Sequence, residues 1–226
     1  MNHRKLQELF FAGTDTDVGK TYVTALVARR LKAAGRRVGV YKPVASGCVE
    51  RAGRRIADDA VALWEAAGKP RTLEEVCPQR FLEPLAPPEA AAAEGKSVDL
   101  DRLLSAAEVW QHDCDVLLIE GAGGLFSPLG DGLLNVDLAR QLDAEVVLVT
   151  ANRLGVIHQV LATCRAAAHA GTPIRGIFFS CPDSSEDGSQ PSNPAQVARY
   201  CDVPILGVVP HGGGPEHVAG IERILG

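Results

Sequence analysis

The stretch GTDTDVGKT at residues 13–21 constrains the fold more than any other part of the sequence. It follows an apolar run at 8–12 that is typical of a buried strand. It precedes an amphipathic helix predicted over 20–34, with Gly35 at its C-terminal end. A loop between a strand and a helix directs backbone N–H groups at an anion. The usual phosphate-loop pattern G-x-x-x-x-G-K-[ST] would place its first glycine at position 14, where this sequence has Thr, so the loop is atypical.

Five further apolar runs follow along the chain, and amphipathic segments separate most of them. The runs are continuous rather than alternating, which is typical of strands that are covered on both faces. We therefore predict an α/β fold of the P-loop NTPase type, a mainly parallel sheet with helices on both faces, in a single domain over 1–226. The predicted strands are 8–12, 37–41, 115–120, 145–150, 174–180 and 205–209. The predicted helices are 20–34, 58–67, 100–111, 155–169 and 194–200.

Two stretches show neither pattern. Residues 77–95 contain four prolines, so we expect a long loop with a short helix at 88–94. Residues 181–195 are polar, and we expect a second, mobile loop there. Neither stretch is long enough to separate two domains.

The composition argues for small-molecule chemistry. A net charge of −5 leaves no basic surface of the kind that nucleic-acid binding needs. No stretch approaches the roughly 18 apolar residues of a membrane-spanning helix, and the apolar run near the start is too short for a signal peptide. The six cysteines are scattered without a C-x-x-C pair, which predicts reduced thiols rather than disulfides or a zinc site. We expect a cytoplasmic protein that binds neither nucleic acid nor membranes.

Lys20 and Thr21 carry the chemistry of the phosphate-binding loop. Lys20 would place a positive charge against the β- and γ-phosphates, and the Thr21 hydroxyl would bind Mg²⁺. An ordinary turn that is followed by Lys-Thr is the alternative. Gly-Lys-Thr at the start of the first helix in a six-strand pattern favours the phosphate-binding interpretation.

Charged residues follow two more of the predicted strands. Lys42, in YKPVASG, lies where ligand sites gather in open α/β sheets, although a solvated surface lysine is the alternative. Glu120, in EGAGG, ends a buried strand and is placed like the carboxylate that holds Mg²⁺ in P-loop enzymes, with Asp137 as a weaker candidate. Asp58 and Asp59 open the next predicted helix, where a carboxylate also interacts favourably with the helix dipole.

A further helix begins after the strand at 145–150, with Leu154 and Gly155 at its start. The free N–H groups there could bind a carboxylate. His158 on this helix is expected to be a surface residue rather than a catalyst.

Taken together, GTDTDVGKT, YKPVASG, DDAVAL, EGAGGLFSPL and RLGVIH closely resemble the dethiobiotin synthetase family, in the same order and with compatible spacing from about residue 8 to 210. The resemblance implies a homodimeric P-loop enzyme of biotin biosynthesis, with ATP as co-substrate and Mg²⁺ as cofactor. Such an enzyme closes the ureido ring of dethiobiotin from 7,8-diaminononanoate, CO₂ and ATP. The diamine and CO₂ form a carbamate, ATP phosphorylates it to a carbamic–phosphoric anhydride, and the second amine attacks the activated carbon.

The resemblance also implies roles for individual residues. Lys20, Lys42 and Thr16 would act in catalysis, and Thr16 and Ser46 would contact the substrate. Asp59 is preferred to Asp58 because DAVAL matches the family's Asp-Ala-x-x-Leu, and the residues expected at Mg²⁺ are Thr21, Asp59 and Glu120. Those expected at the nucleotide are Asp17, Val18, Gly19, Lys20, Thr21, Tyr22, Ser180, Cys181, Pro210, His211 and Gly212. Those expected at the substrate's carboxylate tail, reached across the dimer interface, are Leu154, Gly155, Val156 and His158.

The sequence departs from the family pattern at two places. His158 stands where the family commonly has Asn, a change that carboxylate binding through backbone N–H groups should survive. Ser180-Cys181 stands where the family has Asn-Asp, so the amide that both donates to and accepts from the ring edge of adenine is missing. We therefore expect weaker discrimination between purine and other nucleoside triphosphates. Pro210 matches a proline of the family's nucleotide-base wall.

Two other P-loop proteins are alternatives. A partition-type ATPase switch carries an additional early lysine, as Lys-Gly-Gly-x-Gly-Lys-Thr, which the loop here lacks. An amidating synthase of the cobyrinic acid type needs a fused glutamine amidotransferase domain, for which 226 residues leave no room. With these alternatives disfavoured, the resemblance to dethiobiotin synthetases implies that Thr14, Asp15 and Thr16 of the loop face a second reactant.

Overall fold

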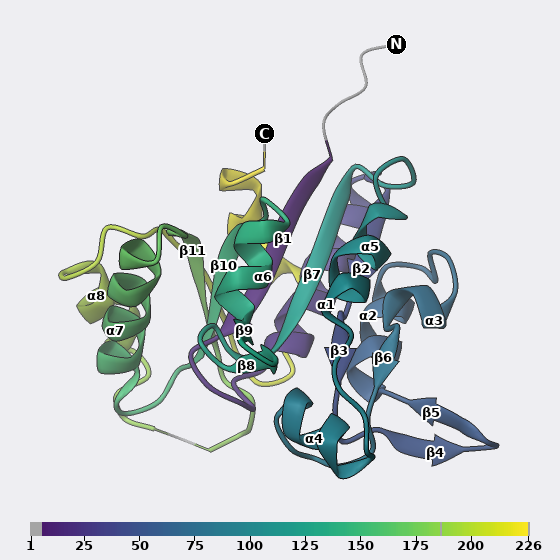
Figure 1. Cartoon of the computed structure of the whole chain (residues 1–226). Helices are drawn as coiled ribbons and strands as arrows, with labels where there is room; N and C mark the ends of the chain where they lie inside the picture. Colours follow the sequence, from purple (N-terminus) through teal and green to yellow (C-terminus); the bar gives the residue numbers. More distant parts are fainter. Residues whose placement is uncertain (1–5, 186, 226) are drawn as a thin grey trace.

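The structure, a computed structural model, describes residues 6–185 and 187–225 and contains a six-stranded parallel sheet (Figure 1). All six predicted strands are confirmed. Their spatial order is β12-β11-β10-β1-β7-β2, so β1 lies inside the sheet between β10 and β7. The strands are β1 (Gln7–Gly13), β2 (Val38–Tyr41), β7 (Val116–Gly124), β10 (Glu145–Ala151), β11 (Ile174–Ser180) and β12 (Ile205–Val209).

Helices cover both faces of this sheet, as predicted. One layer contains α1, which contacts both α2 and the C-terminal 3₁₀ helix η1, while α5, α6 and α7 lie over the opposite face (Figure 1). Each predicted helix is present to within three residues at either end. The helices are α1 (Lys20–Ala33), α2 (Asp58–Ala66), α3 (Leu73–Val76), α4 (Pro87–Ala93), α5 (Leu100–Glu108), α6 (Asn135–Gln141), α7 (Val156–His169), α8 (Asn193–Ala198) and η1 (Pro215–Arg223).

The two stretches predicted as loops are partly ordered. The short helix expected at 88–94 is α4, which begins with prolines at its first two positions, where the missing N–H costs nothing. The expected loop at 181–195 ends earlier than predicted, because α8 begins at Asn193.

Three small two-stranded sheets were not predicted, since their strands have at most three residues and therefore no readable period. They are β3 (Val44–Ala45) with β6 (Gln79–Arg80), β4 (Val49–Arg51) with β5 (Arg54–Ile56), and β8 (Pro128–Gly130) with β9 (Leu133–Leu134).

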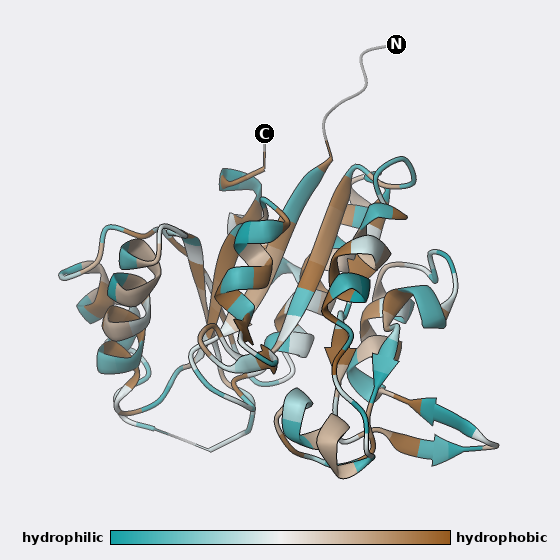
Figure 2. Ribbon diagram, in the orientation of Figure 1, coloured by the Kyte–Doolittle hydropathy of each residue, from teal (hydrophilic) through white to brown (hydrophobic). Residues whose placement is uncertain are grey.

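The core lies in and around the central strands, which are the most uniformly apolar part of the ribbon (Figure 2). Phe10 and Phe11 on β1 and the run Leu117–Ile119 on β7 have no exposed surface. Burial on both faces explains why these runs do not alternate with polar residues. None of the helices in the described parts of the chain is long and apolar enough to cross a membrane.

Because the sheet is parallel, the carboxyl ends of its strands meet at one edge, the lower edge in Figure 1. The order β1-β7-β2 places the phosphate-binding loop, Glu120 and Lys42 on adjacent strands or directly after them. The sheet topology therefore brings together three motifs that are about 20 to 100 residues apart in the sequence.

Candidate active site

The first half of the phosphate-binding loop is held against the strands by Thr14. Its N–H donates to the Val149 carbonyl at 3.0 Å, and its hydroxyl lies 2.9 Å from that of Thr150. A Cβ on Gly13 would lie 2.4 Å from the Asp15 carbonyl oxygen, so the chain turns back too tightly for any other residue at position 13. The early glycine is thus required by the geometry of this loop.

Only one of the three polar residues expected to face a second reactant lines the cavity. Thr16 is on the cavity wall, whereas Thr14 is turned toward β10. The Asp15 carboxylate accepts the Thr16 N–H at 2.7 Å and so shapes the loop itself. The expectation was therefore wrong for Thr14, because its hydroxyl is used to fasten the loop to the sheet.

The second half of the loop opens α1 with two left-handed residues. Asp17 has φ of 56° and Gly19 has φ of 82°. Left-handed residues that alternate with right-handed ones turn successive N–H groups inward and form a concave binding site for anions. A Cβ on Gly19 would also lie 2.4 Å from Ser180 Oγ, so glycine permits the close approach of β11. Lys20 follows directly, is nearly buried, and has its Nζ 3.4 Å from the Asp15 carbonyl oxygen.

Lys42 is buried and lies at the centre of a network of charges that runs from the buried Glu120 to Asp59, whose side chain is exposed. Its Nζ donates to Glu120 Oε1 at 2.7 Å and to Asp59 Oδ2 at 3.1 Å. The Thr21 hydroxyl donates to the same Glu120 oxygen at 2.9 Å. Asp58 instead faces Arg51 at 3.7 Å, so the geometry favours Asp59 over its neighbour as a site residue. Asp137 pairs with Arg140 and caps α6, which favours Glu120 as the strand-end carboxylate.

The pKa values in this network follow from burial and from the opposite charges. Burial lowers the pKa of Lys42, but the Glu120 and Asp59 carboxylates outweigh it, so the pKa is raised above its ordinary value. The Lys42 charge lowers the pKa of Asp59. Burial, together with the Lys42 charge, lowers the pKa of Lys20. Lys42 is therefore a fixed cation at neutral pH, and Lys20 is the cation whose charge a bound anion would stabilise most.

The residues expected to hold Mg²⁺ are close together and fit such an ion. Thr21, Asp59 and Glu120 offer the oxygen ligands that Mg²⁺ prefers. Glu120 is fully buried, yet its Oε2 atom has no hydrogen-bond partner. A buried carboxylate oxygen without a partner is costly, and a bound cation is one way of satisfying it.

Lys42, Asp59 and the loop line a cavity of about 830 Å³, whereas the fully buried Glu120 does not line it. Of the predicted site residues, the cavity is lined by Thr16, Asp17, Gly19, Lys20, Thr21, Tyr22, Lys42, Ser46 and Asp59. Pro84 to Pro87 form another wall, which the prediction of a loop at 77–95 did not anticipate. A proline-rich segment is preordered, so it can form a cavity wall with little loss of chain entropy.

Segments expected at the nucleotide base meet beyond the loop. The Tyr22 hydroxyl donates to the Gly213 carbonyl at 2.6 Å, and His211 Nδ1 lies 3.2 Å from the Pro182 carbonyl oxygen. Cys181 donates its N–H to Val209 at 2.8 Å. These contacts join α1 to the ends of β11 and β12, although Ser180, Cys181, Pro210, His211 and Gly212 do not line the cavity itself.

Asn135 positions the glycines after Glu120, and it was not found from the sequence. Its side-chain amide donates to the carbonyls of Ala122, Gly124 and Ser127 at 2.7, 2.9 and 3.1 Å, and its Oδ1 accepts the Ala122 N–H at 3.1 Å. The amide is fully buried, and its hydrogen bonds fix the segment that lines the cavity at Gly123. An Asn at the start of a helix normally indicates a cap, which hides this second use.

The start of α7 lies outside this cavity. Leu154 is 82% exposed, and its N–H donates to Asp187 Oδ2 at 2.7 Å. Gly155 adopts φ of 93°, Val156 is buried and His158 is exposed, as expected of a surface residue. The four residues predicted at the substrate's carboxylate tail therefore do not share a cavity with Lys42 of the same chain.

Comparison with known proteins identifies the family. Residues 7–213 match a family model described as an AAA domain. The ATP-dependent dethiobiotin synthetase of Rhodopirellula baltica is 48% identical over 217 residues, which cover 91% of this chain and 85% of that protein. The enzyme of the same name from Aromatoleum aromaticum is 37% identical, covering 96% and 97% of the two chains. The chain belongs to the dethiobiotin synthetase family.

Solved structures with lower identity share the fold of this dethiobiotin synthetase family member. The septum site-determining protein MinD of Pyrococcus horikoshii, complexed with Mg-ADP, superimposes with a TM-score of 0.54 at 16% identity. The matched region covers 96% of this chain and 88% of the MinD chain. The signal recognition particle receptor FtsY of Elizabethkingia anophelis has a TM-score of 0.52 at 18% identity. The matched region covers 96% of this chain and 62% of the FtsY chain. Both comparisons agree with a P-loop sheet.

The ion pair of Lys42 with Glu120 predicts a specific pattern of stability. Lys42→Ala leaves a buried carboxylate without its cation and should lower the free energy of unfolding by about 3–5 kcal/mol. Lys42→Ala/Glu120→Gln also removes the buried negative charge and should recover at least about 1 kcal/mol of this loss. Urea denaturation at neutral pH measures both.

Lys96→Ala is the matched control, because Lys96 is exposed and its partner Glu94 keeps a second cation, Arg55. Its loss should cost less than about 1 kcal/mol. A Lys42→Ala variant as stable as the wild type, or a double variant less stable than Lys42→Ala, would contradict a buried pair held together by charge.

Proposed function

We propose that this chain is an ATP-dependent dethiobiotin synthetase, a ligase that forms dethiobiotin from 7,8-diaminononanoate, CO₂ and ATP in biotin biosynthesis. The observation that carries the proposal is the arrangement of two buried lysines, Lys20 and Lys42, beside one cavity. Thr16 and Ser46 add hydroxyl groups to the same cavity, which leaves room for a second reactant next to the phosphate-binding loop. The relatives named above share this activity by name.

The chemistry joins two anions. One amine of the substrate adds to CO₂ and loses a proton, which gives a carbamate. A carbamate oxygen then attacks the γ-phosphorus of ATP, ADP leaves, and a carbamic–phosphoric anhydride results. The second amine attacks the carbonyl carbon and loses a proton, phosphate leaves, and the ureido ring closes. Because carbamate and γ-phosphate repel each other, the site must neutralise both before they react.

The side chains of this chain supply that neutralisation. Lys20, in the phosphate-binding loop, faces the phosphates, and Lys42 lies on the side of the carbamate. Lys42 is already fixed by Glu120 and Asp59, so little reorganisation is needed when the reactants bind. All covalent changes occur between the substrates, so the protein needs no nucleophile–base pair.

Mg²⁺ would be held by Thr21, Asp59 and Glu120. Bound there, it would neutralise charge on the β- and γ-phosphate oxygens. The support is the oxygen donor set and the unpartnered Glu120 Oε2 atom described above.

We place the substrate's carboxylate tail at the start of α7 in a partner subunit of a cytoplasmic homodimer. The support is that Leu154, Gly155 and His158 are exposed and lie outside the cavity of their own chain. The first N–H groups of a helix attract a carboxylate. Asp187 accepts the N–H of Leu154 just before this helix, so backbone beside the helix start already binds a carboxylate.

A partition-type ATPase is not favoured. The likeness to MinD concerns the fold alone at 16% identity, whereas relatives with 36–48% identity over most of the chain are named dethiobiotin synthetases.

The proposed activity is tested by its product. The protein mixed with 7,8-diaminononanoate, bicarbonate, Mg²⁺ and ATP should form dethiobiotin, which mass spectrometry detects. One molecule of dethiobiotin should form for each molecule of ADP released. Lys42→Ala should still bind ATP, because Lys20 and Thr21 remain, but should form no dethiobiotin. Hydrolysis of ATP at the same rate without the diamine, and no product with it, would favour a nucleotide switch instead.

Nucleotide selection is a second expectation. Ser180 and Cys181 lack the amide that reads the edge of adenine, so the kcat/KM values for ATP, CTP and GTP should lie within about tenfold of one another. The double variant Ser180→Asn/Cys181→Asp should increase the preference for ATP. A wild-type preference for ATP of roughly a thousandfold would show that other groups read the base.

A further inference from the structure

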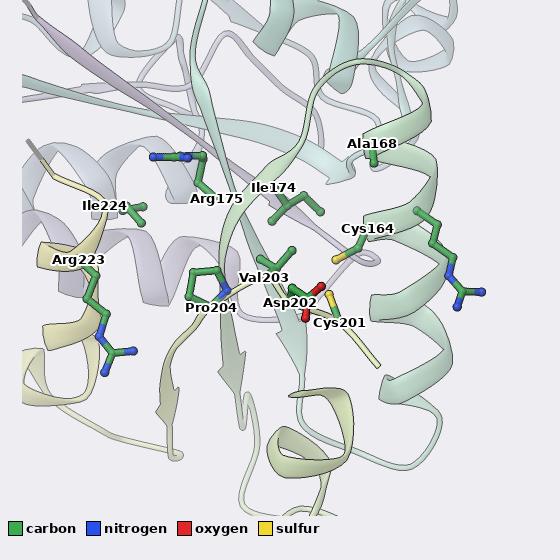
Figure 3. Close-up of a pocket in the computed structure, with 11 residues that line it drawn as sticks. Cys164, Ala168, Ile174, Arg175, Cys201, Asp202, Val203, Pro204, Arg223 and Ile224 are labelled. Carbon is green, nitrogen blue, oxygen red and sulfur yellow. The ribbon is translucent and has the colours of Figure 1, made fainter. Parts of the chain in front are cut away.

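A second cavity, of about 600 Å³, lies at the opposite edge of the sheet from the proposed active site (Figure 3). It is lined by Ile174 at the amino end of β11 and by Val203 and Pro204 just before β12. Its floor contains two cysteines, Cys164 and Cys201. Nothing in the proposed ring closure uses this cavity or either thiol.

The two thiols lie next to each other on the lining of this cavity. Figure 3 shows the sulfur atoms of Cys164 and Cys201 turned toward one another from different elements. Their proximity also acts on the pKa of Cys164, which is raised by burial and, in addition, by the neighbouring Cys201 thiol. Both are free, Cys164 is 9% exposed, and Cys201 is partly exposed and packs against the core. A reagent in solvent can therefore reach the pair through Cys201.

The packing of α7 explains why the pair is close. Cys164 belongs to the buried stripe of α7, with Val156, Val160 and Ala167, at the three- and four-residue spacing of one helix face. Cys201 follows α8, which packs against α7. The contact is thus produced by the fold, between residues 37 positions apart in the sequence.

We infer that Cys164 and Cys201 form a redox-active dithiol, which a low-molecular-weight disulfide converts into an intramolecular disulfide bond. The inference is independent of the proposed ligase activity.

The reaction proceeds by two thiol–disulfide exchanges. The thiolate of Cys201 attacks one sulfur of the small disulfide, an S–S bond forms between them, and one small thiolate leaves and takes up a proton. Cys164 then loses its proton and attacks Cys201 Sγ, and the second small thiolate leaves. The protein gives up two electrons and two protons in total, and the small disulfide is reduced to two thiols. Burial raises the pKa of Cys164 to about 12, so the second exchange should be faster in more alkaline buffer.

Oxidised glutathione is the probe for this test, applied to the folded, full-length protein. We expect the thiol count of the wild type to fall from six to four, and we expect one disulfide-linked peptide pair that contains Cys164 and Cys201. Dithiothreitol should restore all six thiols. Cys164→Ser should stop at a stable glutathione adduct on Cys201, because the resolving thiol is missing.

Cys181→Ser is the matched control, since Cys181 is the other partly exposed thiol. This variant should still lose two thiols and form the same linked peptides. A wild type that keeps six thiols, that accumulates only the glutathione adduct, or that links Cys181 to another cysteine would overturn the inference. These outcomes are read from the wild type, so they hold even if a cysteine variant folds poorly.

Discussion

The ion pair between Lys42 and Glu120 is the interaction on which the rest of the site depends. Glu120 is fully buried and Lys42 nearly so, and the atoms that join them are 2.7 Å apart. An isolated charge at this depth would be very costly, so each residue requires the other. The pair therefore fixes how the end of β2 lies against β7, and β7 in turn borders the strand that carries the phosphate-binding loop.

This constraint also determines what the cavity can bind. Lys20 and Lys42 are matched by Asp59 and Glu120, so the centre of the site carries no large excess of either charge before a ligand arrives. Anionic reactants add negative charge next to Lys20, whose pKa is lowered by burial and by its neighbour. The unpartnered oxygen of Glu120 offers a place for a cation that accompanies them. These contacts support the proposed site for two anions and a metal ion.

Sequence patterns predicted the parts that depend on local order. Continuous apolar runs gave the six strands and their parallel arrangement, and Gly19-Lys20-Thr21 gave the start of α1. The proximity of Lys42, Asp59 and Glu120 was predicted from the resemblance, and the sheet order supplies its cause. The family name was likewise predicted from motifs and matches the relatives.

Features that arise from long-range packing were not predicted. The direction of the Thr14 side chain depends on Thr150, which lies 136 residues away. Asn135 reads as a helix cap, yet its amide holds the segment after Glu120. The contact between Cys164 and Cys201 exists only because α8 packs on α7. No sequence period or local motif records such contacts.

The path of one oxygen atom tests the proposed use of this cavity most directly. With freshly dissolved ¹⁸O-labelled CO₂ in unlabelled water, phosphate released in early turnovers should carry ¹⁸O. The reason is that the carbamate oxygen that attacks the γ-phosphorus leaves with the phosphate when the ring closes. Phosphate without ¹⁸O would mean that water attacks ATP, and it would contradict a site in which Lys20 and Lys42 bring carbamate and phosphate together.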